Sequence, residues 1–212
     1  MTTSAERKIR FAIFASGQGS NAMALLDEME TLGNQGEISF VLSDRAEAPV
    51  LEKSQMRGVK NILMEVQGSK KEQEEKILKL LAEHQVDWIL LAGYMRLLSP
   101  TFIETFASWH QGQEQIINIH PSLLPAYPGK DSLQRAFADR VPFSGVTLHC
   151  VDAGMDTGSV LLQEQVPRRD EDSLENFVQR AHSTEHRMYR HFVREICLLR
   201  RPTAFFTGSP HV

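Results

Sequence analysis

Three polar residues in the second half of the chain could together carry out proton-transfer chemistry. Asn118 and His120 lie two residues apart in the apolar segment Ile116–Pro121, and Asp156 lies in a loop rich in small residues. Side chains two apart on a strand point to the same face, so we expect Asn118 and His120 to project together. Polar side chains at the end of a buried strand are costly unless they are used. These three residues are therefore candidates for a catalytic set.

An amide, an imidazole and a carboxylate suit acyl transfer. An Asn side chain and a protonated His can stabilise a developing oxyanion, while a neighbouring carboxylate stabilises the imidazolium and helps to move a proton. The set contains no Ser or Cys nucleophile, so we predict direct attack by an amine of the substrate, or by water, instead of a covalent acyl-enzyme. The alternatives are a structural, hydrogen-bonded His120 and an ordinary turn aspartate at Asp156.

A glycine-rich turn near the N-terminus is a second candidate site. Gly17, Gly19 and Ala22 stand between an apolar and an amphipathic segment, and Asp44 follows 22 residues after Ala22. This spacing satisfies the dinucleotide-binding pattern in its Gly/Ala form, with Asp44 as the acid for a ribose hydroxyl. Backbone N–H groups at a helix start attract any anion, so one phosphate monoester fits as well as a pyrophosphate. A turn that binds nothing remains the structural alternative.

Strands that alternate with helices must position these residues. Helices are expected around Met23–Met29, after Pro49 and after Ser69, which would cap the charged third helix. The predicted parallel strands are Phe11–Ala15, Ile38–Leu42, Asn61–Val66, Trp88–Ala92 and Gln115–Ile119. This alternation predicts an α/β fold with a parallel, doubly wound sheet. Ligands bind at the carboxyl ends of such strands, where the candidate residues fall.

The pattern changes after Pro121. Two strand-like segments, Gly145–Asp152 and Ser159–Val166, flank the loop that holds Asp156, so we expect antiparallel strands there. The segment Ser173–Leu199 is expected to form a long closing helix. The mostly parallel sheet is therefore predicted to become antiparallel in its C-terminal part.

Length and composition narrow the class of protein. The 212 residues allow one large domain or two small ones. Lys and Arg total 23 against 27 for Asp and Glu, which argues against a dedicated binder of nucleic acid or of membrane surfaces. No apolar run approaches the ~20 residues of a membrane-spanning helix, and no signal peptide is recognisable. Cys150 and Cys197 make no disulfide framework. We predict a cytoplasmic globular protein.

Six segments occur in this order along the chain: Ser16–Asn21, Ala92–Leu98, Asn118–Pro125, Tyr127–Gly129, Gly145–His149 and Asp152–Gly158. With these segments the sequence resembles a known family, the phosphoribosylglycinamide formyltransferases, which are the folate-dependent formyltransferases of purine synthesis. The resemblance extends from Phe11 to the helix around Glu185.

The resemblance implies one formyltransferase domain over residues 1–212 with a Rossmann-like fold. Residues 9–120 would form its phosphate-binding part, and residues 121–200 its folate-binding and catalytic-loop part. The implied reaction transfers the formyl group of 10-formyltetrahydrofolate, a cosubstrate, to the amine of glycinamide ribonucleotide. No metal, nucleic acid or membrane partner is implied, and the choice between a monomer and a homodimer stays open.

The resemblance also implies roles for individual residues. His120 would be the acid and oxyanion stabiliser, Asn118 the second oxyanion donor, and Asp156 the carboxylate that stabilises the His120 imidazolium and relays the proton. The residues expected to bind glycinamide ribonucleotide are Gly19, Ser20 and Asn21 at its phosphate and Glu185 at its amine. The residues expected to bind folate are Met95, Arg96, Leu97, Leu98, Asn118 and Lys71.

Some positions depart from the family pattern. Lys71 stands where the family often has an arginine, and a lysine keeps the charge but loses the bidentate fork. Ser159 replaces a common proline after the Asp156 turn, and Lys130–Ser132 is atypical after Tyr127–Gly129. None of these positions belongs to the catalytic three.

Four other functions compete with this interpretation. A formyltetrahydrofolate deformylase would use the same Asn, His and Asp with water, but such proteins usually carry an N-terminal regulatory domain, and only about eight residues precede the first predicted strand here. A transferase acting on methionyl-tRNA would need a basic RNA-binding surface, and the excess of acidic over basic residues argues against one. A dinucleotide-binding oxidoreductase would explain the glycine turn and Asp44 but not Asn118, His120 and Asp156. The polar trio also counts against a non-catalytic binding module.

Overall fold

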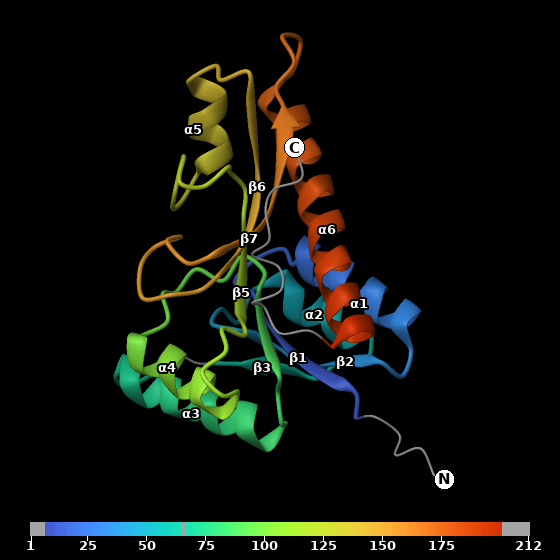
Figure 1. Cartoon of the computed structure of the whole chain (residues 1–212), viewed down its shortest axis with the longest axis vertical. Helices are drawn as coiled ribbons and strands as arrows, with labels where there is room; N and C mark the ends of the chain where they lie inside the picture. The colour runs from blue at the N-terminus through green and yellow to red at the C-terminus, as the bar shows by residue number, and fades with distance from the viewer. Residues whose placement is uncertain (1–6, 65–66, 201–212) are drawn as a thin grey trace.

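A seven-stranded mixed sheet organises the chain, in the order β3-β2-β1-β4-β5-β6-β7 (Figure 1). The structure is a computed structural model that describes residues 7–64 and 67–200. The strands are β1 Ile9–Phe14, β2 Gly36–Ser43, β3 Asn61–Leu63, β4 Trp88–Leu91, β5 Ile116–His120, β6 Phe143–Cys150 and β7 Val160–Pro167. The helices are α1 Ser20–Leu32, α2 Pro49–Met56, α3 Lys70–Glu83, α4 Pro100–Trp109, α5 Ser132–Ala138 and α6 Leu174–Leu199.

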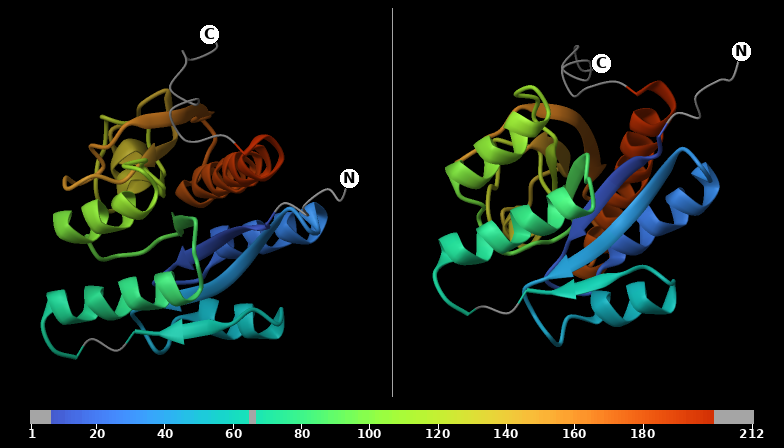
Figure 2. Two further views of the ribbon diagram at one scale, coloured as in Figure 1. Left: turned by 60° about the horizontal axis from the view of Figure 1, so that its bottom comes forward. Right: turned by 90° about the horizontal axis from the view of Figure 1, so that it is seen from below.

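Helices cover both faces of the sheet. Side chains of α1, α2 and α6 form one core, and those of α3 and α4 form the other, so the sheet lies between two helical layers (Figure 2). The central strand β1 feeds both cores, because Phe11 and Ile13 point to the first and Ala12 and Phe14 to the second. This two-sided burial explains why residues Phe11–Phe14 of β1 are an uninterrupted apolar run.

The parallel part of the sheet was predicted from the sequence, and it is confirmed. Strands β1 to β5 pair in parallel, and β6 and β7 pair antiparallel to their neighbours. Ser69 caps α3 with a capping box that uses Glu72, as its position before the charged segment suggested. The closing helix α6 begins one residue after Ser173, which is its N-cap.

Some predicted boundaries were wrong. The third strand, expected at Asn61–Val66, ends at Leu63, and Val66 lies outside the described residues. The fourth strand ends one residue before Ala92.

Two helices, α4 and α5, were not predicted. For α4 a signal was present, because Ser99 is a capping residue and Pro100 suits the first helical turn. α5 has seven residues and no side-chain cap, so no comparable signal precedes it.

The topology brings distant segments to one edge. Strands β1, β2, β4 and β5 are parallel, so their carboxyl ends, at Phe14, Ser43, Leu91 and His120, lie along the same side of the sheet. β6 runs the opposite way and pairs His149 with Asn118. The loop between β6 and β7, which carries Asp156, therefore starts beside Ile116 and Ile117 at the amino end of β5 and brings Asp156 back to Asn118 and His120.

Candidate active site

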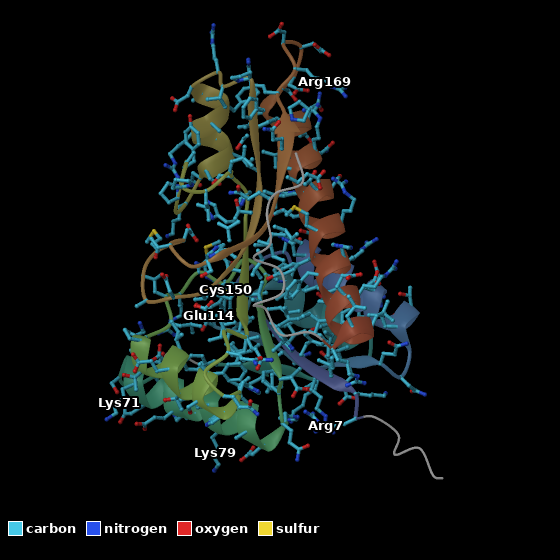
Figure 3. The ribbon with its side chains drawn as sticks, viewed as in Figure 1. Arg7, Lys71, Lys79, Glu114, Cys150 and Arg169 are labelled. Carbon is cyan, nitrogen blue, oxygen red and sulfur yellow. The ribbon has the colours of Figure 1, made fainter. Side chains whose placement is uncertain are left out.

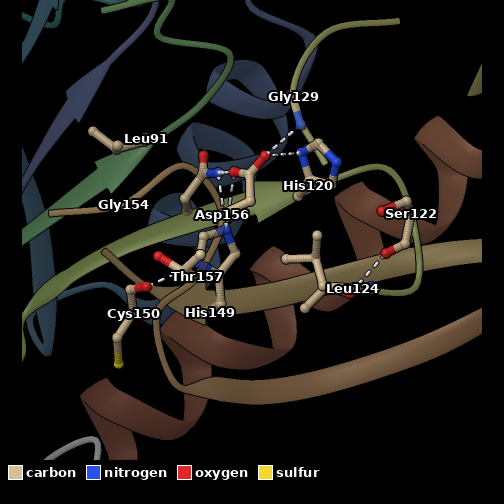
Figure 4. Close-up of polar contacts among 12 residues, drawn as sticks. Leu91, His120, Ser122, Leu124, Gly129, His149, Cys150, Gly154, Asp156 and Thr157 are labelled. Carbon is tan, nitrogen blue, oxygen red and sulfur yellow. Dashed lines mark hydrogen bonds and ion pairs between the residues drawn. The ribbon is translucent and has the colours of Figure 1, made fainter. Parts of the chain in front are cut away.

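The three predicted catalytic residues meet at the end of β5. Nδ1 of His120 lies 3.3 Å from Oδ2 of Asp156, and Nδ2 of Asn118 donates to Oδ1 of the same carboxylate at 3.4 Å. In Figure 4 the Asp156 carboxylate lies between the rings of His120 and His149. Residues 38 apart in the chain, Asn118 and Asp156, are thus brought into contact as the sequence predicted.

Both ring nitrogens of His120 face acceptors. Nε2 lies 2.9 Å from the backbone carbonyl oxygen of Tyr127, and Nδ1 faces the Asp156 carboxylate. A neutral imidazole has one donor nitrogen, whereas an imidazolium donates from both. The partners therefore match a protonated His120 beside an ionised Asp156. The side chain of His120 is 8% exposed, so little water competes for these contacts.

The charge of Asp156 has several supports. Burial alone would raise the pKa of its carboxyl group, but the contact with His149, the hydrogen bond from the Gly129 N–H at 2.7 Å and the nearby His120 outweigh it and lower the pKa below the ordinary value. Asp156 holds a left-handed backbone conformation with φ of 56°. Such a strained conformation at a buried carboxylate is common at functional sites.

His149 is a fourth polar side chain of the cluster, for which no role was predicted from the sequence. It is buried, its Nδ1 faces the Cys150 carbonyl oxygen at 2.8 Å, and its Nε2 lies 3.1 Å from Nδ2 of Asn118 and 3.6 Å from Oδ1 of Asp156. Only the strand register, which places His149 opposite Asn118, could have revealed this contact. That register requires the antiparallel pairing of β5 and β6 to be known.

A cleft of about 600 Å³ opens beside this cluster. Asn118, His120 and Asp156 line it. The predicted folate residues Met95, Arg96, Leu97 and Leu98 line it as well. Met95 and Leu97 are each 55% exposed, although they are large apolar side chains. Apolar walls with a few polar groups at one end are the usual composition of a small-molecule site.

Lys71 does not line this cleft. Its ammonium group is exposed in the first turn of α3, 3.9 Å from Glu75, and Figure 3 labels it on that helix. The i,i+4 pair is a common surface arrangement on a helix. A role of Lys71 toward folate stays a prediction.

The glycine-rich turn opens α1, where an anion site was predicted. Gly19 is the N-cap with φ of 75°, and Ser20 at the helix start is exposed. No side chain caps this end, so its N–H groups are available to an external anion. Asn21 is 9% exposed, and its Oδ1 finds no hydrogen-bond partner in the described part of the chain.

Glu185 of α6 lies against this turn. Burial raises the pKa of its carboxyl group to about 8, and a hydrogen bond with the Asn21 side chain opposes the rise. Its Oε2 is 3.9 Å from Nε2 of His182, which lines the cleft. The structure thus joins two of the predicted substrate residues, Asn21 and Glu185, through their side chains.

Asp44 has a structural use. The Ser16 hydroxyl donates to its carboxylate at 2.6 Å, and the Met95 N–H donates to the Ser16 hydroxyl at 3.0 Å. These bonds tie the glycine turn to the loop after β2 and to the segment after β4. The carboxylate that a dinucleotide site would direct at a ribose hydroxyl is therefore engaged within the protein.

Other reactive groups lie apart from the reaction centre. Cys150 and Cys197 are buried free thiols, and burial raises their pKa values to about 12 and about 11. Within residues 7–64 and 67–200, no group of three or more His, Cys, Asp or Glu side chains could hold a metal ion. None of the helices in these ranges has an apolar stretch long enough to cross a membrane.

Comparison with known proteins identifies the family. The family model described as formyl transferase matches residues 9–193, which include every element from β1 to most of α6. The chain belongs to the formyl transferase family. The predicted resemblance and the predicted fold class are thereby confirmed.

Individual formyl transferases are similar over nearly the whole domain. Phosphoribosylglycinamide formyltransferase of Bacillus subtilis is 35% identical over 189 residues, covering 88% of this chain and 94% of that protein. The crystal structure of glycinamide ribonucleotide transformylase 1 from Geobacillus kaustophilus is 38% identical with a TM-score of 0.82, covering 90% of this chain and all of that one. The corresponding structure from Symbiobacterium toebii is 34% identical with a TM-score of 0.84, covering 94% and 93%.

Proposed function

We propose that this formyl transferase moves the formyl group of 10-formyltetrahydrofolate to the amine of glycinamide ribonucleotide. The observation that carries the proposal is the contact of the Asp156 carboxylate with His120 and Asn118 at one end of an apolar cleft. The similarity of the chain to phosphoribosylglycinamide formyltransferase of Bacillus subtilis over 88% of its length supports it. We further infer that residues 9–120 supply the phosphate turn and residues 121–200 the catalytic loop.

Direct attack of the amine on the formyl carbon puts negative charge on the formyl oxygen. A protonated His120 can donate to that oxygen, and Asn118 can offer a second N–H. In the structure both groups are engaged with Asp156, Tyr127 or His149. The 3.4 Å bond from Asn118 to Asp156 is the longest of these contacts. It therefore costs little to exchange this bond for one to a substrate oxygen.

The proton lost by the amine needs an acceptor. Asp156 is ionised and buried beside both donors, so it can receive that proton directly or through a water. His149 holds the second carboxylate oxygen and the Asn118 amide, which limits the movement of both groups. The bond from the formyl carbon to the donor nitrogen then breaks, and that nitrogen takes up the proton given up by the amine, through Asp156 or His120, and leaves as tetrahydrofolate. No side chain in the cluster needs to form a covalent intermediate.

The residues of the cleft fit a folate-type donor. Leu91, Leu98 and Val151 provide apolar walls, and Met95 and Leu97 extend them to the surface. A flat pterin ring requires such a slot with polar groups at its edge. The donor supplies the formyl group, and the protein supplies orientation and the hydrogen-bond donors at the reacting oxygen.

The phosphate of the acceptor suits the start of α1. Backbone N–H groups at Gly19–Asn21 and the helix dipole favour a dianion there. The neutral form of Glu185 would hold Asn21 in place without adding a negative charge beside the phosphate. A water acceptor would need neither feature, which favours the transferase over the deformylase.

An assay with and without the acceptor tests this function. The purified chain is incubated with 10-formyltetrahydrofolate alone and with added glycinamide ribonucleotide, and tetrahydrofolate and formylated ribonucleotide are measured. Product that depends on the amine supports the transferase. Equal loss of formyl groups without the amine identifies a deformylase instead.

A further inference from the structure

Arg45 is a cation of the cleft to which the proposed mechanism gives no role. It lies two residues after Ser43, the last residue of β2, and its side chain lines the cleft with those of Met95 and Arg96. Among residues 7–64 and 67–200, its guanidinium group has neither an ion pair nor a hydrogen bond, although its backbone is bonded. A guanidinium has five N–H donors, and here all of them are available to a ligand.

Several arginines outside the cleft have acidic partners. Arg180 makes two bonds to Asp172, and Arg194 reaches the buried carboxylate of Glu28 at 2.7 Å. These pairs show how the fold neutralises its surface guanidinium groups. Arg45 faces a cavity instead of a carboxylate of the chain, as does Arg96, which lines the same cleft and belongs to the predicted folate residues.

The backbone of Arg45 is held firmly beside both parts of the predicted site. The Ser43 hydroxyl accepts from its N–H and donates to its carbonyl oxygen, both at 3.2 Å. The preceding residue, Asp44, accepts from Ser16 at 2.6 Å, and Ser16 accepts from the Met95 N–H. The loop that carries Arg45 is thus joined to the glycine turn and to the folate-facing segment.

The lysine beside the glycine turn is already engaged within the chain. Lys53 lies beside the glycine turn, but its ammonium group donates to the Gln18 carbonyl oxygen at 2.8 Å. Both substrates of the proposed reaction are anions, one through its phosphate and the other through the carboxylates of its glutamate tail. A planar guanidinium matches either group with two parallel hydrogen bonds.

We propose that Arg45 binds an anionic oxygen group of a substrate, either the phosphate of glycinamide ribonucleotide or a carboxylate of the folate tail. The inference rests on the proposed function and adds a binding residue to it. Arg45 contributes affinity and does not touch the reacting atoms, because the acid and carboxylate of the reaction are His120 and Asp156.

The test compares Arg45→Ala, Arg45→Lys and the control Arg169→Ala with the wild type. Arg169 has an exposed side chain at the end of the molecule shown at the top of Figure 3, outside the cleft. KM and kcat are measured for each substrate, and calorimetry gives Kd for glycinamide ribonucleotide and for tetrahydrofolate. We expect Arg45→Ala to raise KM and Kd for one substrate about 10-fold at unchanged kcat, because a hydrogen-bonded ion pair is lost. Arg45→Lys should recover part of the affinity. The control Arg169→Ala should show no defect.

The substrate affected identifies the anion. A rise for glycinamide ribonucleotide, with weaker competitive inhibition by inorganic phosphate, assigns Arg45 to the phosphate. A rise for folate that disappears with a pteroate analogue lacking glutamate assigns it to the tail. If KM and Kd for both substrates stay within twofold of the wild type in Arg45→Ala, the inference is wrong. A wild-type chain that transfers no formyl group refutes the proposed function, and the two Kd values then still decide the role of Arg45.

Discussion

At the scale of single residues, the candidate catalytic cluster is a hydrogen-bonded network in which each side chain has a partner. His120 is held by Asp156 and the Tyr127 carbonyl oxygen, and Asn118 by Asp156 and His149. Substrate must therefore exchange with existing hydrogen bonds when it reaches the donors.

Removing the acid or the carboxylate should affect turnover more than folding. We expect His120→Ala and Asp156→Asn each to lower kcat by roughly 10²- to 10⁴-fold, the usual contribution of positioned acid–base groups. Asn tolerates the left-handed backbone that Asp156 adopts, so the loop should keep its conformation. Steady-state kinetics and thermal melting separate the two effects, with the exposed Asp170→Asn as the control. Near-normal turnover in either cleft variant would contradict the proposed mechanism.

Glu185 should make stability depend on pH. Burial raises its pKa from 4.5 to about 8, so the native state favours the protonated form. The contribution of Glu185 to the free energy of unfolding is therefore fully present below pH 4.5 and is lost as pH rises through about 8. Glu185→Gln cannot ionise and should remove this dependence while keeping an acceptor for Asn21. Melting temperatures of both proteins between pH 5 and 9 check this, with Glu175→Gln on the exposed face of α6 as the control. If the melting temperatures of the wild type and of Glu185→Gln change with pH in the same way, Glu185 ionises freely in the fold.

At the scale of elements, the turn into α1 depends on one close approach. A Cβ on Gly19 would lie 2.4 Å from Cγ2 of Val50, and φ at Gly19 is 75°. Gly17 has open space around the corresponding position. The two glycines of the pattern therefore have different functions, since only Gly19 lets α1 and α2 come together.

This difference can be measured directly. We expect Gly19→Ala to lower the free energy of unfolding by about 1–3 kcal/mol, because a strained backbone and a clash with Val50 both add cost. Gly17→Ala should change it by less than about 1 kcal/mol. Urea denaturation of both variants tests the prediction. Equal losses would mean that the turn, and not the contact with Val50, requires glycine.

At the scale of the whole molecule, α6 closes the fold over the strands that carry the site. The buried Tyr189 hydroxyl lies 2.7 Å from the carbonyl oxygen of Leu91 in β4 and 3.1 Å from that of Ile117 in β5. Phe192 of the same helix contacts the Trp88 ring. A single helix thus connects the ends of two strands that are 25 residues apart, from Leu91 to Ile116.

Loss of this connection should weaken the whole fold. We expect Tyr189→Phe to lower the free energy of unfolding by about 1–2 kcal/mol, because buried carbonyl groups lose a donor. Tyr127→Phe removes a hydroxyl that reaches Asp139 at the surface and should cost much less. Urea titrations of the two variants provide the comparison. An unchanged midpoint for Tyr189→Phe would show that the strand carbonyl groups need no donor from α6.

The sequence by itself determined the order of the seven strands and of four of the six helices, the parallel half of the sheet and a candidate catalytic trio. Its apolar runs are short and continuous where β1 and β4 are buried on both faces, and its capping residues mark the starts of α3 and α6. Asn118 and His120 could be paired from their spacing alone, because alternate residues of a strand share a face.

Only the tertiary structure decided which distant groups touch. The contacts of His149 with Asn118 and of Asn21 with Glu185 depend on strand register and helix packing, which local patterns do not specify. Lys71 and Arg45 are both cations near expected strand ends, yet Arg45 lines the cleft and Lys71 pairs with Glu75 on a helix surface. The physical reason is that spacing along the chain determines the face a side chain occupies, whereas packing of the elements determines what that face meets.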